Sequence, residues 1–242
     1  MAIRRALIIG GTGMLAECAA DLVRAGWRVV LPSRRYLPIH LTRDGEPTGP
    51  DCSAPAQAGA ASVAAGMGSG GSVSGLVGPG TGGTAHWVGA TWSEPAELAA
   101  RSAKALGGRA DLLVAWLPTP VRTAVMRAVA PVLAPDAAVV EVHNSGSADP
   151  IGGCPEPVLA DHPTQQLVLG YRVEGERTRW LTHQEMVAGV LDAVRRAIDT
   201  KPPVVHQVGQ FRAWTGRRAP TRGRRGGSQS AQSTLLRSVP QQ

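Results

Sequence analysis

The spacing of apolar residues near the start of the chain predicts a strand, a helix and a second strand. Residues 6–9 form a continuous apolar run, which is typical of a buried strand. Between residues 15 and 22, apolar side chains recur every three or four positions, as they do on one face of a helix. Gly26 stands where a left-handed residue can end that helix, and residues 28–31 predict the second strand. Together they form a compact strand–helix–strand unit.

The alternation of strands and helices continues to about residue 200. Further apolar runs predict strands at residues 86–90, 111–117, 137–142 and 167–173. Helix-start signals stand before three predicted helices: Ser93 with Glu94 and Pro95, Thr119 with Pro120, and Thr182 with Glu185 as a capping box. Parallel neighbours need a crossover connection, which is right-handed. The pattern therefore predicts an α/β fold, a doubly wound parallel sheet of the Rossmann type.

Composition divides the chain into one domain, an insertion and a tail. Residues 52–93 carry no charged side chain and are largely Gly, Ala and Ser, so they lack the bulky apolar groups that would offset the entropy of ordering. We expect a single dinucleotide-binding domain over residues 1–205, interrupted by a disordered insertion at 44–85. Residues 214–242 show no periodicity and predict a disordered, Arg-rich tail.

The net charge of +7 is a property of that tail. Residues 1–199 hold 17 Lys and Arg against 18 Asp and Glu, and the charged residues after residue 199 are all Lys or Arg. We interpret the tail as a solvated appendage, with a nucleic-acid-binding arm as the alternative. The three cysteines have no metal-ligand spacing, and no apolar run approaches membrane-spanning length. We therefore expect a cytoplasmic protein with no metal and no membrane contact.

A glycine turn joins the first predicted strand to the first predicted helix. Gly10 permits a tight turn, Gly13 lets the backbone approach a phosphate, and Ala16 allows the helix to pack closely on the strand. This arrangement presents backbone N–H groups to a dinucleotide pyrophosphate. The alternative is a Gly-rich turn that binds nothing. The predicted cofactor-binding residues of the turn are Gly10, Gly11, Thr12, Gly13, Met14 and Leu15.

The end of the second strand predicts which dinucleotide binds. Where a carboxylate would hold the ribose hydroxyls of NAD, the chain reads Ser33-Arg34-Arg35. Two guanidinium groups and a hydroxyl favour the 2′-phosphate of NADP; the alternative is that the arginines are surface residues at a strand end. Trp116, at the end of a later strand, is a candidate to flank the nicotinamide or adenine ring.

These residues resemble the short-chain dehydrogenase/reductase superfamily, in an atypical bacterial branch. The likeness spans about residues 3–200 without the insertion, and rests on the glycine turn, the Arg34-Arg35 strand end and the strand at residues 111–116. Two further segments match: His143-Asn144-Ser145-Gly146-Ser147 and Arg179-Trp180-Leu181-Thr182-His183-Gln184-Glu185. The resemblance implies a nucleotide cofactor more firmly than any substrate.

The chain departs from that superfamily at its usual proton donor, a tyrosine with a lysine four residues later. Tyr36 and Tyr171 are followed at that spacing by His40 and Gly175. A reductase built on this chain must therefore draw its proton elsewhere. His143 has an ordinary pKa near neutrality and is the candidate general acid, and Ser145 is the candidate partner of the substrate oxygen or nitrogen. The alternatives are a strand-end histidine bonded to a loop and a serine that only serves its turn.

Taken together, the sequence predicts an NADP-dependent oxidoreductase that moves a hydride between nicotinamide and a small carbonyl or imine substrate. The alternative is a catalytically silent NAD(P)-binding sensor or partner protein, which the absent Tyr/Lys pair favours. A small molecule is the expected partner, nucleic acid is not, and a homo-oligomer stays open.

Overall fold

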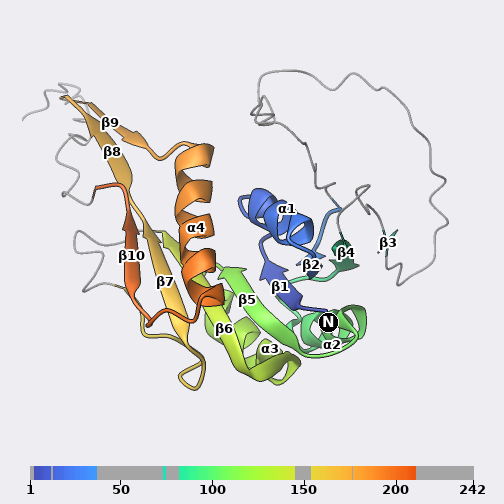
Figure 1. Cartoon of the computed structure of the whole chain (residues 1–242). Coiled ribbons are helices and arrows are strands. Elements are labelled where there is room, and N and C mark those ends of the chain that lie inside the picture. The colour runs from blue at the N-terminus through green and yellow to red at the C-terminus, as the bar shows by residue number, and fades with distance from the viewer. Residues whose placement is uncertain are drawn as a thin grey trace, which may run out of the picture. The chain divides into compact units, whose positions relative to one another are not determined.

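The computed structural model describes residues 3–11, 13–36, 73–74, 82–144, 154–175 and 177–210, which all lie in the first of two units, Met1–Arg212. Among them, a parallel sheet organises the molecule (Figure 1). Its seven parallel strands run in the order β10 (Val205–Val208), β7 (Thr164–Leu169), β6 (Leu133–Asn144), β5 (Ala110–Trp116), β1 (Arg5–Ile9), β2 (Arg28–Ser33) and β4 (Thr84–Gly89). A short strand, β3 (Val73–Ser74), pairs antiparallel with β4 at the sheet edge.

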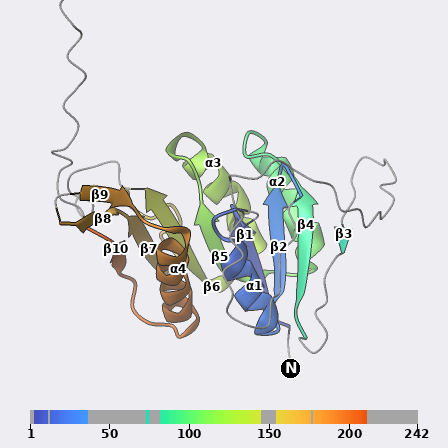
Figure 2. The same cartoon turned by 90° about the horizontal axis from the view of Figure 1, so that it is seen from above.

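Helices cover both faces of this sheet (Figure 2). One face packs against α1 (Ala16–Arg24) and α4 (His183–Ile198), and the other packs against α2 (Pro95–Leu106) and α3 (Thr119–Val129). Each face buries its own apolar cluster, so each strand in the middle of the sheet is covered twice, as parallel strands require. The predicted doubly wound, Rossmann-type α/β fold is confirmed.

The order of the strands places a switch point between β1 and β5. The chain leaves β1 toward β2 and β4 on one side, and returns through β5 toward β6, β7 and β10 on the other. In such sheets, ligands bind in the crevice beyond the carboxyl ends of the strands at this point. The glycine turn after β1 lies at that crevice.

The first helix forms as its apolar spacing predicts. Leu15, Cys18, Ala19 and Leu22 are all buried against the sheet. Gly26 follows the helix with φ of +87°, a conformation that glycine adopts without steric cost. Its buried face fixes α1 on β1 and β2, and so fixes where the glycine turn points.

The capping box of the last long helix is also confirmed. The Thr182 hydroxyl accepts from the Glu185 backbone N–H at 3.2 Å, and a Glu185 carboxylate oxygen accepts from the Thr182 backbone N–H at 2.8 Å. Helix α4 therefore begins at a defined residue, which matters because its first turn borders the candidate site.

Predicted boundaries at α2 and at β7 are wrong. Ser93 does not cap α2: its hydroxyl pairs with that of Thr91 at 3.0 Å, and Glu94 holds the N-cap position without a side-chain hydrogen bond. The strand predicted at 167–173 breaks at Gly170, and Tyr171 begins a separate hairpin made of β8 (Tyr171–Glu174) and β9 (Arg177–Trp180).

Several predictions fall on residues that the structure does not describe. Thr12, Ser145 and the tail at 214–242 lie outside the described residues. So does most of the predicted insertion at 44–85, of which residues 73–74 belong to β3 and residues 84–85 belong to β4.

Adjacent glycines before β4 provide a test of this packing. A Cβ at Gly83 would lie 2.1 Å from the Val23 carbonyl oxygen and 2.8 Å from that of Trp27, whereas a Cβ at Gly82 would meet nothing within 4 Å. Because backbone atoms cannot rotate away, we expect Gly83→Ala to lower the free energy of unfolding by about 1–3 kcal/mol. The matched control Gly82→Ala should stay within about 0.5 kcal/mol. Urea denaturation measures both; equal effects would contradict the packing.

Candidate functional site

The glycine turn is tight and packs closely against the end of β5. Gly10 has φ of +94°, and a Cβ there would lie 3.2 Å from the Trp116 carbonyl oxygen at the end of β5. The Gly13 N–H donates to the Gly10 carbonyl at 3.3 Å, and the Ala16 N–H donates to the Gly13 carbonyl at 3.1 Å. Only glycine fits at Gly10, because its conformation is left-handed and the neighbouring strand is close.

The residues predicted to bind the cofactor in this turn divide into two groups. Gly11 and Leu15 are buried: a Cβ at Gly11 would lie 2.3 Å from the Leu31 side chain, and Leu15 has no exposed surface. Gly13 is exposed, and among the described residues a Cβ there would meet only the Gly10 carbonyl oxygen, at 4.0 Å. The first pair therefore holds the turn against the sheet, and Gly13 faces open space in front of α1.

At the end of β2, Ser33 and the two arginines form a tight turn. The Ser33 hydroxyl donates to the Arg35 carbonyl at 3.0 Å and accepts from the Arg35 N–H at 3.3 Å. The Arg34 and Arg35 side chains are exposed, and neither forms an ion pair within the part of the chain that is described. Tyr36 packs edge-on against Trp87 beside them, with ring centroids 5.8 Å apart.

A cavity of about 390 Å³ opens at the carboxyl ends of β5, β6 and β7. It lies at the switch point, next to the glycine turn, and its volume falls in the range of small-molecule sites, about 300–1,000 Å³. Its described lining is mostly apolar and comes from the turn, the strand ends and the start of α4: Met14, Trp116, Asn144, Leu169, Gly170, Trp180, Leu181 and Met186. Two of the predicted cofactor residues, Met14 and Trp116, are therefore brought together.

His143 lies outside this cavity. Successive residues of a strand point to opposite faces, and Asn144 lines the cavity, so His143 points to the face covered by α3. Its Nε2 atom lies 3.5 Å from the Gln166 Nε2 atom and 3.8 Å from a Glu141 carboxylate oxygen. Because the Gln166 amide nitrogen can only donate, this contact suits a neutral imidazole that accepts at Nε2.

Burial supports the same protonation state. Burial, and then the positive charge of Arg122, lower the pKa of His143 to about 4. At neutral pH the ring is therefore uncharged. The prediction that His143 donates a proton to substrate is untested, and it requires the side chain to leave its present contacts. Ser145, the second predicted catalytic residue, lies outside the described residues.

A buried ion pair on the same face was not predicted from sequence. Glu141 is 2% exposed, and Arg122 of α3 donates to it through Nε at 2.7 Å. Glu141 also accepts from the Val158 N–H at 3.3 Å, and Arg122 donates to the Glu156 carbonyl at 2.7 Å. The pair therefore ties the segment after residue 153 to the sheet. An acidic residue in an apolar strand was the only sequence signal for it.

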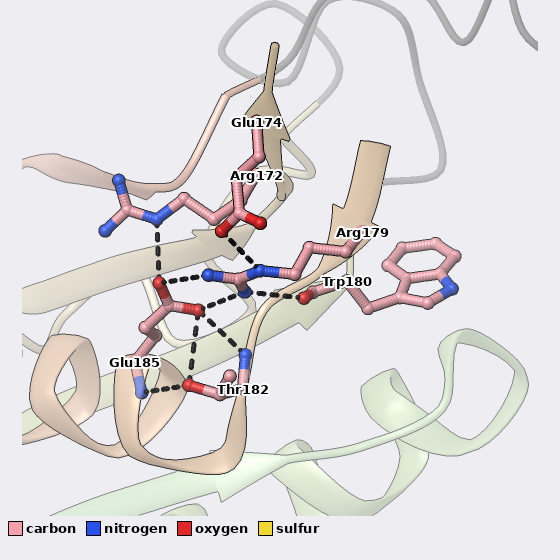
Figure 3. A network of polar contacts seen from close by, with 6 residues as sticks. All are labelled: Arg172, Glu174, Arg179, Trp180, Thr182 and Glu185. Atoms are coloured by element: carbon pink, nitrogen blue, oxygen red, sulfur yellow. Dashed lines mark hydrogen bonds and ion pairs between the residues drawn. The ribbon is translucent and has the colours of Figure 1, made fainter. Parts of the chain in front are cut away.

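A second polar network holds the β8–β9 hairpin to the start of α4 (Figure 3). Glu185 accepts from Arg172 at 2.9 Å and from Arg179 at 2.8 Å, in addition to its capping contacts with Thr182. Arg179 also donates to Glu174 at 2.7 Å. The Arg179 guanidinium, followed by the Thr182 N–H, holds the pKa of Glu185 well below its usual range. The carboxylate therefore stays ionised, and the hairpin stays anchored beside the cavity.

The remaining candidates do not form a site. Tyr171 is buried, and it exchanges backbone hydrogen bonds with Gln210. The residue four positions after Tyr171 is Gly175, not a lysine, and the other tyrosine of the sequence is Tyr36. Within the described ranges, no group of three or more His, Cys, Asp or Glu side chains is placed to hold a metal. None of the helices there is both long and apolar enough to cross a membrane.

Solved structures with the same fold are short-chain dehydrogenases/reductases and related reductases. An NADH-dependent reductase, A1-R′, complexed with NAD, superimposes with a TM-score of 0.51 at 16% identity, over 85% of this chain and 95% of that one. A short-chain dehydrogenase/reductase variant from Serratia marcescens gives 0.50 at 9% identity, over 85% and 95%. No protein-family model and no curated protein matches the sequence. The chain therefore shares the Rossmann-type fold of these proteins.

The state of His143 predicts how stability depends on pH. Its pKa is near 6.5 in the unfolded chain and about 4 in the folded protein, so the unfolded state binds the proton more tightly. The neutral His143 side chain therefore contributes to the free energy of unfolding fully above pH 6.5, and this stabilisation is lost as the pH falls toward 4. We expect His143→Gln to lose less stability than the parent between pH 7 and 5 in urea titrations. Burial also lowers the pKa of His86 and of His206, but both residues are present in parent and variant and so affect the two proteins alike. Identical pH dependence in the two proteins would contradict the assignment.

Proposed function

We propose that this chain is a short-chain dehydrogenase/reductase-type, NADP-dependent oxidoreductase that acts on a small carbonyl or imine compound. The observation that carries the proposal is the cavity at the switch point, which adjoins a glycine turn whose backbone faces open space in front of α1. The fold shared with the reductase and the dehydrogenase/reductase above supports dependence on a nicotinamide cofactor, since A1-R′ is NADH-dependent; the preference for NADP is argued from Arg34 and Arg35 alone.

The residues present fit a dinucleotide. The space beside Gly13 and the position of this turn at the N-terminus of α1 suit a pyrophosphate. The exposed guanidinium groups of Arg34 and Arg35 suit a 2′-phosphate. The cavity beside Met14 and Trp116 suits the nicotinamide end. When bound, the nicotinamide supplies or accepts the hydride.

The chain's own contribution is to orient the reactants and exclude water. The apolar lining removes water from the reacting groups, and the Asn144 amide offers a hydrogen bond to a substrate oxygen or nitrogen. Ser145 follows directly in sequence, and we keep it as the candidate second donor. His143 would supply a proton only after a rearrangement of its contacts with Gln166 and Glu141.

A catalytically silent NAD(P)-binding protein is the second candidate function. One observation favours it: within the described part of the chain, the cavity lining carries no side chain that titrates near neutral pH. The two functions differ in turnover, not in cofactor binding.

Paired substitutions at the end of β2 test the choice of cofactor. We expect Arg34→Ala with Arg35→Ala to weaken NADPH binding by about tenfold or more and to leave NADH binding nearly unchanged, because only NADPH carries the 2′-phosphate. Arg127→Ala, an exposed arginine on α3, is the matched control. Calorimetry measures both affinities. Equal losses for the two dinucleotides would overturn the assignment to NADP.

Turnover separates the enzyme from the silent protein. We expect NADPH oxidation with at least one member of a panel of small aldehydes, ketones and imines, and a fall in kcat/KM of about 100-fold in Ser145→Ala. Thr123→Ala, which removes an exposed hydroxyl from α3, should have no effect. NADPH binding without oxidation of any panel member would favour the silent protein.

A further inference from the structure

We propose that His183 is a dinucleotide-binding residue that contacts the pyrophosphate, and that Glu17 holds its imidazole until the dinucleotide binds. This inference deepens the proposed function and rests on it for the identity of the ligand. It starts from an ion pair between two helices whose first turns border the cavity.

The ion pair joins the first turn of α4 to the first turn of α1. The Nε2 atom of His183, the first residue of α4, lies 3.2 Å from a carboxylate oxygen of Glu17. Helices α1 and α4 pack on the same face of the sheet (Figure 1 and Figure 2), so the pair connects two neighbouring elements. Among the described residues, no other ion pair joins these two helices.

His183 lies between residues that already define the candidate site. On α4, Met186 lines the cavity three positions after His183, and residues three apart share a helix face. On the α1 side, Met14 lines the cavity three positions before Glu17, and the space beside Gly13 adjoins the same turn. The imidazole therefore lies at the boundary between the cavity and the proposed pyrophosphate site.

The charges at these two helix starts suit an exchange of partners. Helix α1 has no side-chain cap at its N-terminus, which favours an anion there, but the carboxylate of Glu17 in its first turn repels one. An imidazolium from α4 would attract a phosphate oxygen through a charge-assisted hydrogen bond. The hairpin arginines Arg172 and Arg179 are paired with Glu185 instead. His183 is therefore the basic side chain at the start of α4 that faces α1.

The pair is accessible enough to be displaced. The side chains of His183 and Glu17 are 37% and 55% exposed, respectively. Ion pairs this exposed contribute little to folding, because water and salt screen them. A pyrophosphate carries more negative charge and more acceptor oxygens than one carboxylate, so it can replace Glu17 as the partner of His183. Breaking the pair by substitution should accordingly leave the fold intact.

Two substitutions with opposite expected effects test this exchange. We expect His183→Gln to weaken the binding of NADPH and of NADH about fivefold each, because both dinucleotides lose the same contact. Glu17→Gln should tighten both about threefold, because it removes the competing carboxylate. Calorimetry of the full-length protein at about pH 6 and low salt, where a solvent-accessible imidazole carries a proton, measures these affinities.

The exposed pair between Asp192 and Arg195, farther along α4, provides matched controls. Asp192→Asn removes the same charge as Glu17→Gln, and Arg195→Gln removes the same charge as His183→Gln. Both controls should leave the two affinities within about twofold of the parent values, because salt screens distant exposed charges. Urea denaturation should show that all four variants keep the parent's unfolding midpoint.

Loss of affinity in both His183→Gln and Glu17→Gln would overturn the inference, because the pair would then only hold α1 against α4. Unchanged affinities, or a change confined to NADPH, would overturn it as well. Inorganic pyrophosphate separates the inference from the proposed function. If the protein binds pyrophosphate with the same opposite responses but binds neither dinucleotide, the proposed function fails and His183 remains an anion-binding residue. Binding of none of the three ligands would overturn both.

Discussion

The close approach of Gly10 to the end of β5 is the constraint on which the candidate site depends. The left-handed backbone at Gly10 turns the chain so that the Gly10 carbonyl accepts a hydrogen bond from the Gly13 N–H. Because Gly10 has no side chain, its backbone can lie close to the Trp116 carbonyl. As a result, Met14 and Trp116 line one cavity although about a hundred residues separate them. The glycine turn is therefore positioned by steric contact with the neighbouring strand as much as by its own conformation.

Polar networks fix the two chain segments that border the strand ends. On the α3 face, the Glu141–Arg122 pair binds the segment that leads into β7. Around α4, Glu185 binds the hairpin that carries Trp180. Burying an ion pair costs several kcal/mol of desolvation per ion, and its attraction offsets that cost only with good geometry and further hydrogen bonds. The backbone contacts of Glu141 and Arg122 supply those bonds, so the pair serves mainly to specify where the crossover lies.

The sequence predicted the elements whose burial follows a simple period. Helix α1, the capped helix α4 and the central strands were predicted because a single apolar face or run defines each of them. Strand β7 was predicted to begin at residue 167, three residues late, because Thr164, Gln165 and Gln166 are polar yet buried. Gln165 is satisfied by the Lys201 and Pro202 carbonyls and by His206, partners that are remote in sequence. Such compensation cannot be inferred from local pattern.

For the site, the sequence predicted the positions of backbone segments better than the directions of side chains. The turn and the strand ends followed from motif and topology, which fix backbone position. The direction of the His143 side chain depends on strand register relative to α3 and α4, and a shift of one residue would have reversed it. The roles of Arg172 and Arg179 depend on a hairpin that begins at Tyr171, where an apolar run had predicted a continuous strand.

The central claim is that a dinucleotide pyrophosphate binds in front of α1, and calorimetry of Gly13→Ala with NADPH tests it most directly. A Cβ at this position would meet no atom of the described residues closer than 4.0 Å, so the variant should keep the parent's unfolding midpoint. It should lose NADPH affinity by about tenfold or more, because the methyl group would occupy the space of the phosphate. Unchanged NADPH affinity in a stably folded Gly13→Ala protein would contradict the account.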